Sequence, residues 1–594
     1  MRFRSLKNWQ TEFDISALLF FAQRMEELLF DYTLDTYKPS ALNAPALCAE
    51  ALLVLEDIES GVLDEANLKH VLDELEWSIH GDRVAKSMLE GDLSRYLPRS
   101  ENVPYTERRL KLQVLAGVLN PYRYFERCVH YLGEAIRASK KKEIDELART
   151  LCTTLINLGQ SKHFLYKNTV DFFYYQENKF SETRDSFQAF IQLIWPYTHH
   201  FDVYFIASSL LNKIHEESAH FKVEKVDSIP EKLVEFSAKS GFVLKSDEVL
   251  VRINDIQSFD IYSARMEAES RLNKVRDLFV LFSHKAQLTW REEALIVQLC
   301  CEGEPAIVKK NRSSMEKGFD LRPAVAAKRM NWMLRNINLS SSGSFERFDR
   351  VVELHGIGVT HNIPENQLLN LWISLETLTP SHAGQNKVAG VVASLNPTLM
   401  LNYILRLVEQ VASDLVHWDK YKTKKILKKI STQSQSIRAA TLRLLTLQSC
   451  EPLRNELYAA LSDFHLLRYR IFRLSESLSS PAKVKELLDL HERKVSWQIR
   501  RIYRTRNLVV HSGKAPSFIH ALIENGHNYL DQVMSQVMLA SCGEYNLNSL
   551  DQVFEFTKIR YERFGKQLAA IETFADENVE FLLVNQSLAT SYTD

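Results

Sequence analysis

Apolar residues recur every three or four positions through most of the chain, which is the spacing that lets an α-helix bury one face. This pattern predicts an almost wholly helical region over residues 1–197 and further helices from about residue 345 onward. Between them, short runs rich in β-branched and aromatic residues predict strands at 201–207, 241–245 and 248–253. We therefore expect a mainly α fold with a small α/β segment in its middle.

The composition excludes several classes of protein. With 594 residues, of which 45% are hydrophobic and 25% charged, the chain has the make-up of a folded globular protein. Its formal net charge of −1 provides no overall attraction to nucleic acid or to an anionic membrane. The seven cysteines include no C-x-x-C pair, which favours reduced thiols and no zinc site. The apolar stretch near residues 15–21 is too short to span a bilayer, and we expect a cytoplasmic protein that binds no membrane.

A cluster of small polar residues at 339–344 has no apolar period and predicts a linker. We place a domain boundary there, and a second one near residue 197, where the helical pattern gives way to strand-like runs. The expected parts are a helical N-terminal region over 1–197, a small α/β segment over 198–338, a helical domain over 345–545, and a C-terminal helix with a frayed tail over 546–594.

The common catalytic signatures are missing from the sequence. It contains no P-loop, no complete dinucleotide-binding glycine motif, no H-E-x-x-H, no EF-hand loop and no G-x-S-x-G. Two histidine groupings are weak metal candidates, His199-His200 with Asp202, and His355 with His361. The alternative for the second grouping is a surface turn, and we assign no metal and no cofactor.

The segment from Arg493 to Lys514 stands apart because it contains seven lysines or arginines and no carboxylate. Such a segment has a strongly positive local field, which suits a polyanion such as RNA. A solvated basic face is the plainer explanation. If RNA binds, the residues expected to contact it are Arg500, Arg501, Arg504 and Lys514.

One arginine of this segment falls in an unusual position. Arg506 follows Ile499 and Ile502 at steps of three and four, so it lies on the apolar stripe of its own helix. An unpaired guanidinium is costly to bury, so it should meet a carboxylate, backbone carbonyls or a bound anion. His511 comes five residues later, and Gly513 suits the end of the helix. A five-residue step turns about 140° on an ideal helix, so Arg506 and His511 converge only if the helix loosens or a second copy supplies the other side.

Arg506, Asn507 and His511 together resemble the Arg-polar-x-x-x-His signature of HEPN-domain ribonucleases, which also lies at the end of a long helix. Spacing alone is weak support, because other arginine and histidine pairs in this chain satisfy it as well. What favours Arg506 is the asparagine directly after it, its position on the stripe and its basic surroundings. The resemblance implies catalytic roles for all three residues.

An upstream segment strengthens the resemblance. Trp372 and Glu376, in the sequence Leu-Trp-Ile-Ser-Leu-Glu, are similar to the tryptophan-leucine-glutamate helix of HEPN proteins from the Abi and ApeA-like antiviral groups. The likeness covers residues 345–545 and implies a HEPN-type helical bundle there. Glu376 would then support the site by pairing with Arg506 or a neighbouring arginine, and the alternative is an exposed helix glutamate.

The resemblance implies a metal-independent endoribonuclease that works as a homodimer. In such an enzyme His511 acts as general acid or base, Arg506 holds phosphate oxygens in a bidentate fork, and Asn507 orients the histidine or the phosphate. It also implies a regulated toxin of antiviral abortive infection, with a phage-derived or cellular trigger acting on the N-terminal region. One rival is a non-catalytic helical module that binds RNA or a partner protein. Another is a metal-dependent nuclease built on His199, His200 and Asp202.

Overall fold

The computed structural model divides the chain into two compact units. The helical unit contains Met1–Thr153 and Ser313–Asp594, together with the short segment Lys179–Thr183, and the sheet unit contains Thr154–Asn178 and Arg184–Arg312. The structure describes residues 1–9, 14–30, 33–98, 103–176, 183–213, 219–301, 303–316, 320–341, 343–380, 387–430, 436–513, 515–542 and 545–583.

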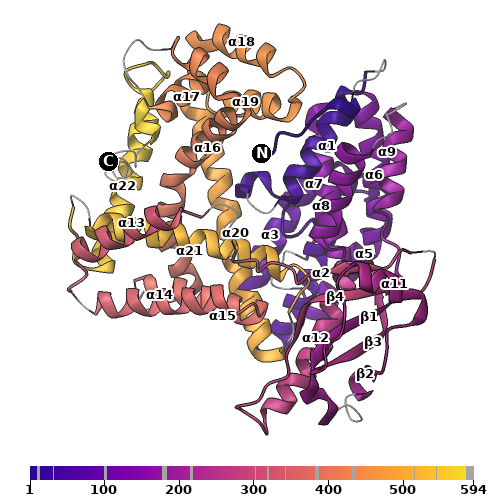
Figure 1. Ribbon diagram of the computed structural model, residues 1–594. Helices are drawn as coiled ribbons and strands as arrows, with labels where there is room; N and C mark the ends of the chain where they lie inside the picture. The colour runs from indigo at the N-terminus through magenta and orange to yellow at the C-terminus, as the bar shows by residue number, and fades with distance from the viewer. Residues whose placement is uncertain are drawn as a thin grey trace. The chain divides into compact units, whose positions relative to one another are not determined.

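The fold class expected from the sequence is confirmed, because the chain is mainly helical with a small sheet in its middle segment. The helical unit is built from two groups of helices, coloured indigo to purple and rose through orange to yellow in Figure 1. The first group is α1 (Ser16–Leu29), α2 (Ala44–Glu59), α3 (Ala66–Gly81), α4 (Arg83–Met88), α5 (Tyr105–Val118), α6 (Pro121–Arg137) and α7 (Lys141–Leu158). The second group is α13 (Pro323–Asn336), α14 (Ser344–Thr360), α15 (Pro364–Leu378), α16 (Lys387–Leu427), α17 (Ile437–Thr446), α18 (Glu451–Leu461), α19 (His465–Ser477), α20 (Pro481–Ser512), α21 (Ile519–Cys542) and α22 (Leu550–Ala570).

The compact units differ from the four parts that the sequence suggested. Residues 1–153 and 313–594 form one unit, and buried ion pairs connect their helices. Arg470 of α19 is 4% exposed and pairs with Glu27 of α1 and with Asp414 of α16, the latter at 2.8 Å. Removing one member of such a pair would leave a buried charge without its partner, so the two groups of helices depend on each other.

Local signals fixed most helix ends, but some breaks were not predicted. The helical pattern expected from residue 345 onward breaks between α18 and α19, where Ser462 has a positive φ of 44°. The helical pattern is also interrupted between α16, which ends at Leu427, and α17, which begins at Ile437. Within α16 the backbone is non-helical at Asp419. Such breaks depend on tertiary packing that apolar spacing does not report.

Helix α16 is the one described helix that is long and apolar enough to cross a membrane by length and composition. In its most apolar window, 78% of the residues are buried inside the protein. Val408 and Val411, for example, are fully buried in a cluster of apolar residues that also includes Leu444 and Ile471. This burial is what a core helix shows.

The sheet unit contains an antiparallel sheet with the strand order β2-β3-β1-β4-β5, drawn in magenta in Figure 1. Successive residues of the central strand enter two separate cores, because side chains alternate across a strand. Phe205 packs with α12 on one face, and Tyr204 packs with α11 on the other. The elements of this unit are α8 (Lys162–Val170), α9 (Thr183–Leu193), β1 (His199–Ser208), β2 (Val223–Val226), α11 (Glu231–Lys239), β3 (Glu248–Ser258), α12 (Ile261–Val280), β4 (Trp290–Gln298) and β5 (Ala306–Val308).

Two of the three predicted strands are confirmed as β1 and β3. The predicted strand at 241–245 is wrong, because this segment is the turn and loop that follows α11. Its apolar character comes from Phe242, which is 3% exposed and whose backbone oxygen accepts a hydrogen bond from Ser237. Strands β2, β4 and β5 were not predicted from the sequence.

Candidate functional site

Helix α20 carries the residues expected to form the site, and its two ends follow from local sequence. At its start the side chain of Ser480 accepts a hydrogen bond from the backbone N–H of Lys483, and Pro481 occupies the first helical position. At its end Gly513 has φ of 66° and donates its N–H to the backbone oxygen of Val509, as the sequence predicted. The buried Val495, which belongs to the apolar stripe, fixes the rotation of the helix in the core.

Arg506 is half-buried and has no carboxylate partner among the described residues. Its Nη1 donates to Oδ1 of Asn507 at 3.0 Å, and Asn507 is 5% exposed. The Nε of Arg506 is buried and has no hydrogen-bond acceptor within the described part of the chain. A guanidinium offers five donors and no acceptor, so the group retains capacity for an oxygen-rich ligand.

His511 lies in the last turn of α20 and is exposed. The carboxyl of Asp57 on α2 is close enough to feel the charge of His511, although burial is the main cause that raises the pKa of Asp57. Helix α20 stays α-helical to Ser512, so the helix end does not loosen. The five-residue step therefore turns about 140°, and one chain does not bring the Arg506 and His511 side chains to the same face of the helix.

The predicted supporting residues connect α15 with α20, but in a different way from the one expected. Trp372 is 1% exposed, and its ring centroid lies 5.2 Å from that of Tyr503 on α20. The indole N–H of Trp372 donates to Oε2 of Glu376 at 3.0 Å. The second partner of Glu376 is Lys387, at 3.5 Å. The expected pairing of Glu376 with an arginine is therefore wrong, and Glu376 instead fixes the tryptophan that packs against α20.

Two of the predicted RNA contacts are corrected by the structure. Arg501 is fully buried and pairs with Glu50 of α2 and Glu74 of α3. Arg504 is 5% exposed and pairs with Glu50 at 2.8 Å. These carboxylates come from more than 400 positions earlier in the chain, so the basic segment gave no sign of them. Arg500 is half-buried, and Lys514 lies outside the described residues.

The ion pairs shift the pKa of the groups around them. Burial would raise the pKa of Glu50, but the charges of Arg501 and Arg504 outweigh it and lower the pKa to about 2. For Glu74, burial dominates, and its pKa is raised despite Arg501. Burial, followed by the charges of Arg500 and Arg504, lowers the pKa of His70 on α3 to about 4. At neutral pH the middle of α20 therefore lies beside the ionised carboxylate of Glu50 and the neutral imidazole of His70.

The metal site suggested by His199, His200 and Asp202 is contradicted by the strand geometry. His199 and His200 are neighbours on β1, so their side chains point to opposite faces of the sheet. His199 instead lies beside a pair of cysteines. Its Nδ1 is 3.5 Å from Sγ of Cys300, and Cys301 completes a group of three potential ligands.

His355 and His361 are not brought together either. His361 ends α14, where its Nδ1 lies 3.2 Å from the backbone oxygen of Ile357 on its own helix. His355 faces α21, where His527 and Asp531 lie within reach. All seven cysteines are free thiols, as expected.

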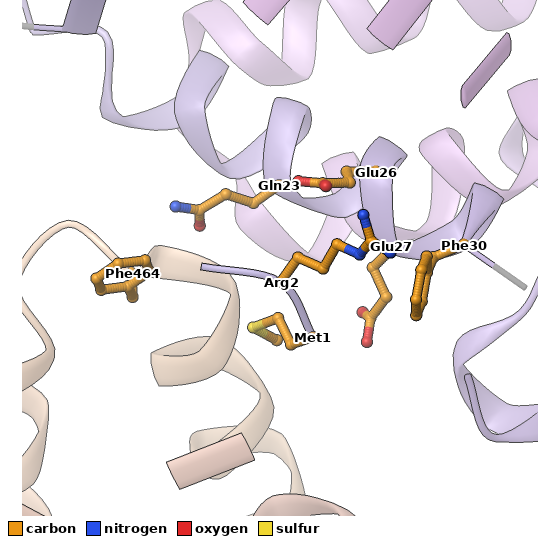
Figure 2. A pocket seen from close by; sticks show the side chains of 7 residues that line it. All are labelled: Met1, Arg2, Gln23, Glu26, Glu27, Phe30 and Phe464. Carbon is orange, nitrogen blue, oxygen red and sulfur yellow. The ribbon is translucent and has the colours of Figure 1, made fainter. Parts of the chain in front are cut away.

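A small pocket lies away from these residues, at the first helix (Figure 2). Glu26 and Glu27 line it from α1, and Phe464 lines it from the start of α19. Both carboxylates already have cationic partners, since Glu26 pairs with Arg4 and Glu27 pairs with Arg24 and Arg470. The pocket therefore offers no unpaired catalytic group. Figure 2 also shows Arg2 passing beneath Glu26. The other residues that line the pocket are Met1, Gln23 and Phe30.

No protein-family model, curated protein or solved structure matches this chain. Function must therefore be inferred from the residues and their arrangement. Among the groups predicted from sequence, Arg506, Asn507 and His511 lie near one end of α20 and form no ion pair with a described carboxylate. Arg501 and Arg504, in contrast, form ion pairs with carboxylates.

Proposed function

We propose that this chain is a metal-independent endoribonuclease of the HEPN type. The observation that carries the proposal is the half-buried Arg506, which has an asparagine for a partner and a buried Nε without an acceptor among the described residues. It lies on the same helix as two arginines that carboxylates neutralise. A phosphate would supply the oxygens that Arg506 lacks, in the bidentate geometry that guanidinium favours.

In the proposed reaction RNA supplies its own nucleophile. The 2′-oxygen forms a bond to the adjacent phosphorus, and the bond from that phosphorus to the 5′-oxygen of the next nucleotide breaks. One His511 takes the proton of the 2′-hydroxyl, and the His511 of a second copy gives a proton to the departing 5′-oxygen. Arg506 stabilises the charge that develops on the phosphorane. The products carry a 2′,3′-cyclic phosphate and a 5′-hydroxyl, and no metal ion takes part.

A second copy of the chain is part of this proposal. Because α20 remains helical to Ser512, Arg506 and His511 of one chain diverge, and a complete set of groups requires two chains. Val510, next to His511, is 50% exposed although it is apolar, which suits a surface that another subunit covers. We therefore propose a homodimer in which two α20 ends face each other around the RNA.

The contact between α20 and the N-terminal helices supports a regulated enzyme. Arg501 forms ion pairs with Glu50 and Glu74, and Arg504 forms one with Glu50. The carboxyl of Asp57 is close enough to interact with the charge of His511. A signal that displaced α2 and α3 would release two arginines for phosphate. We propose that a phage-derived or cellular trigger acts in this way on a toxin effector of antiviral defence in the cytoplasm.

Induced expression tests this function in cells. Wild-type chain should arrest growth and produce RNA fragments with 5′-hydroxyl ends, whereas Arg506→Ala should do neither at equal expression. Arg493→Ala is the matched control, because Arg493 is an exposed arginine of the same helix, and this variant should behave as wild type. Growth arrest by Arg506→Ala would show that Arg506 is not part of the active site. A wild type that binds RNA but never cleaves it would favour a non-catalytic helical module.

A further inference from the structure

Two histidines and an aspartate from distant parts of the chain meet within the helical unit. The Nε2 atoms of His355 on α14 and His527 on α21 are 2.9 Å apart, although the residues are separated by 172 positions. Oδ1 of Asp531 lies 3.7 Å from each of these nitrogens. The three atoms that meet are therefore two imidazole nitrogens and a carboxylate oxygen, which are all groups that bind metals.

The packing of α21 holds these side chains in place. His527 and Asp531 are four residues apart, so they lie on one face of α21. Gly526, directly before His527, faces the neighbouring helices α20 and α15. A Cβ atom at this position would lie 3.4 Å from Ile502 of α20 and 3.6 Å from Leu371 of α15. The side chain of His527 is 6% exposed, so its ring is fixed in the packed interior.

The distances between the three groups suit ligands of one ion. Zinc binds histidine nitrogen and carboxylate oxygen at about 2.0–2.2 Å, so two such ligands on one ion lie roughly 3–3.6 Å apart. The observed separations of 2.9 and 3.7 Å need only small adjustments to admit an ion. A direct hydrogen bond between the two Nε2 atoms is the alternative, and it requires that one ring carry a proton there and the other not.

We propose that His355, His527 and Asp531 bind a divalent first-row transition metal ion, with Zn²⁺ as the expected occupant. Imidazole and carboxylate ligands suit Zn²⁺, whereas Ca²⁺ and Mg²⁺ prefer sites made of oxygen alone. The side chains of His355 and Asp531 are 28% and 27% exposed, which leaves one side of the ion open to a water ligand. Because the ligands come from two helices, the ion fastens α14 to α21. This inference does not rest on the proposed ribonuclease activity.

Metal titration of the full-length chain tests the site. The chain is stripped with a chelator, the chelator is removed, and Zn²⁺ binding is measured by calorimetry and by elemental analysis. All measurements use a Cys300→Ser/Cys301→Ser background, so that the thiols beside His199 do not contribute. One equivalent of Zn²⁺ should bind. His355→Ala and Asp531→Asn should each weaken binding by at least about 100-fold, because loss of even an outer-sphere partner costs about 10–100-fold.

His361→Ala is the matched control, because His361 is an exposed histidine of the same helix end and should leave Zn²⁺ affinity unchanged. The two ligand variants change partly exposed side chains rather than the buried His527, and circular dichroism confirms that they fold. A second readout is thermal unfolding, since Zn²⁺ should raise the melting temperature of the background chain and not of His355→Ala. Equal Zn²⁺ affinity in the background chain and in both folded ligand variants would overturn the proposal.

Discussion

The middle and the end of α20 both carry arginines, but these arginines differ in whether carboxylates pair with them. In the middle, Arg501 and Arg504 are buried against Glu50 and Glu74. Two residues after Arg504, Arg506 has only the amide of Asn507 as a partner among the described residues. The difference arises entirely from α2 and α3, which supply carboxylates to one stretch and not to the other. A run of arginines in a sequence is therefore not yet a binding surface, because distant carboxylates decide which cations remain available.

The largest expected effect on stability comes from removing a carboxylate that pairs with the arginines in the middle of α20. Glu50→Gln removes the carboxylate that two buried arginines share, and we expect it to lower the free energy of unfolding by about 3–5 kcal/mol. Glu56→Gln, at an exposed position of the same helix, should change it by less than about 0.5 kcal/mol. Urea unfolding followed by circular dichroism measures both. Equal effects of the two variants would show that the ion pairs do not stabilise the fold.

A smaller effect should appear when the pH is lowered. The pKa of His70 is about 4 in the folded chain, below the ordinary value of about 6.5, because of burial and of Arg500 and Arg504. Between these values the unfolded chain binds more protons, so the stability that neutral His70 provides is present above pH 6.5 and is lost as the pH falls toward 4. Because His70 is half-buried, we expect a loss on the order of 1 kcal/mol between pH 7 and pH 5.

His70→Gln isolates this contribution, because glutamine stays neutral over the whole range. Urea unfolding at pH 7 and pH 5 should therefore show a smaller loss in the variant than in the wild-type chain. His361→Gln changes an exposed histidine and should leave the loss unchanged. An identical pH dependence in wild type and His70→Gln would mean that the fold does not lower the pKa of His70.

The smallest effect on stability is expected at the unpaired end of the comparison. Arg506→Gln removes a cation that no described carboxylate holds, so the free energy of unfolding should change by about 0.5 kcal/mol or less. Arg501→Gln, measured alongside, should cost several kcal/mol, because it leaves Glu50 and Glu74 close together without their shared cation. Similar losses at both positions would erase the distinction between the two stretches of the helix.

What could be predicted from sequence was set by local physics. The apolar period located most helices, and Gly513 ends α20 as expected. What failed depends on residues that meet only in the fold. Glu50 reaches Arg501 across 451 positions, and His355 reaches His527 across 172. No pattern within a short stretch of sequence reports such a pairing.

The most direct test of the ribonuclease proposal is cleavage of a synthetic RNA by the purified chain in excess EDTA. We predict cleavage that leaves 2′,3′-cyclic phosphate ends. His511→Ala should slow it by roughly 100- to 10,000-fold, which is the usual contribution of a general acid or base, while folding and RNA binding are kept. The control His361→Ala should cleave at the wild-type rate. Loss of cleavage in EDTA while circular dichroism shows a folded chain, or undiminished cleavage by His511→Ala, would contradict the account.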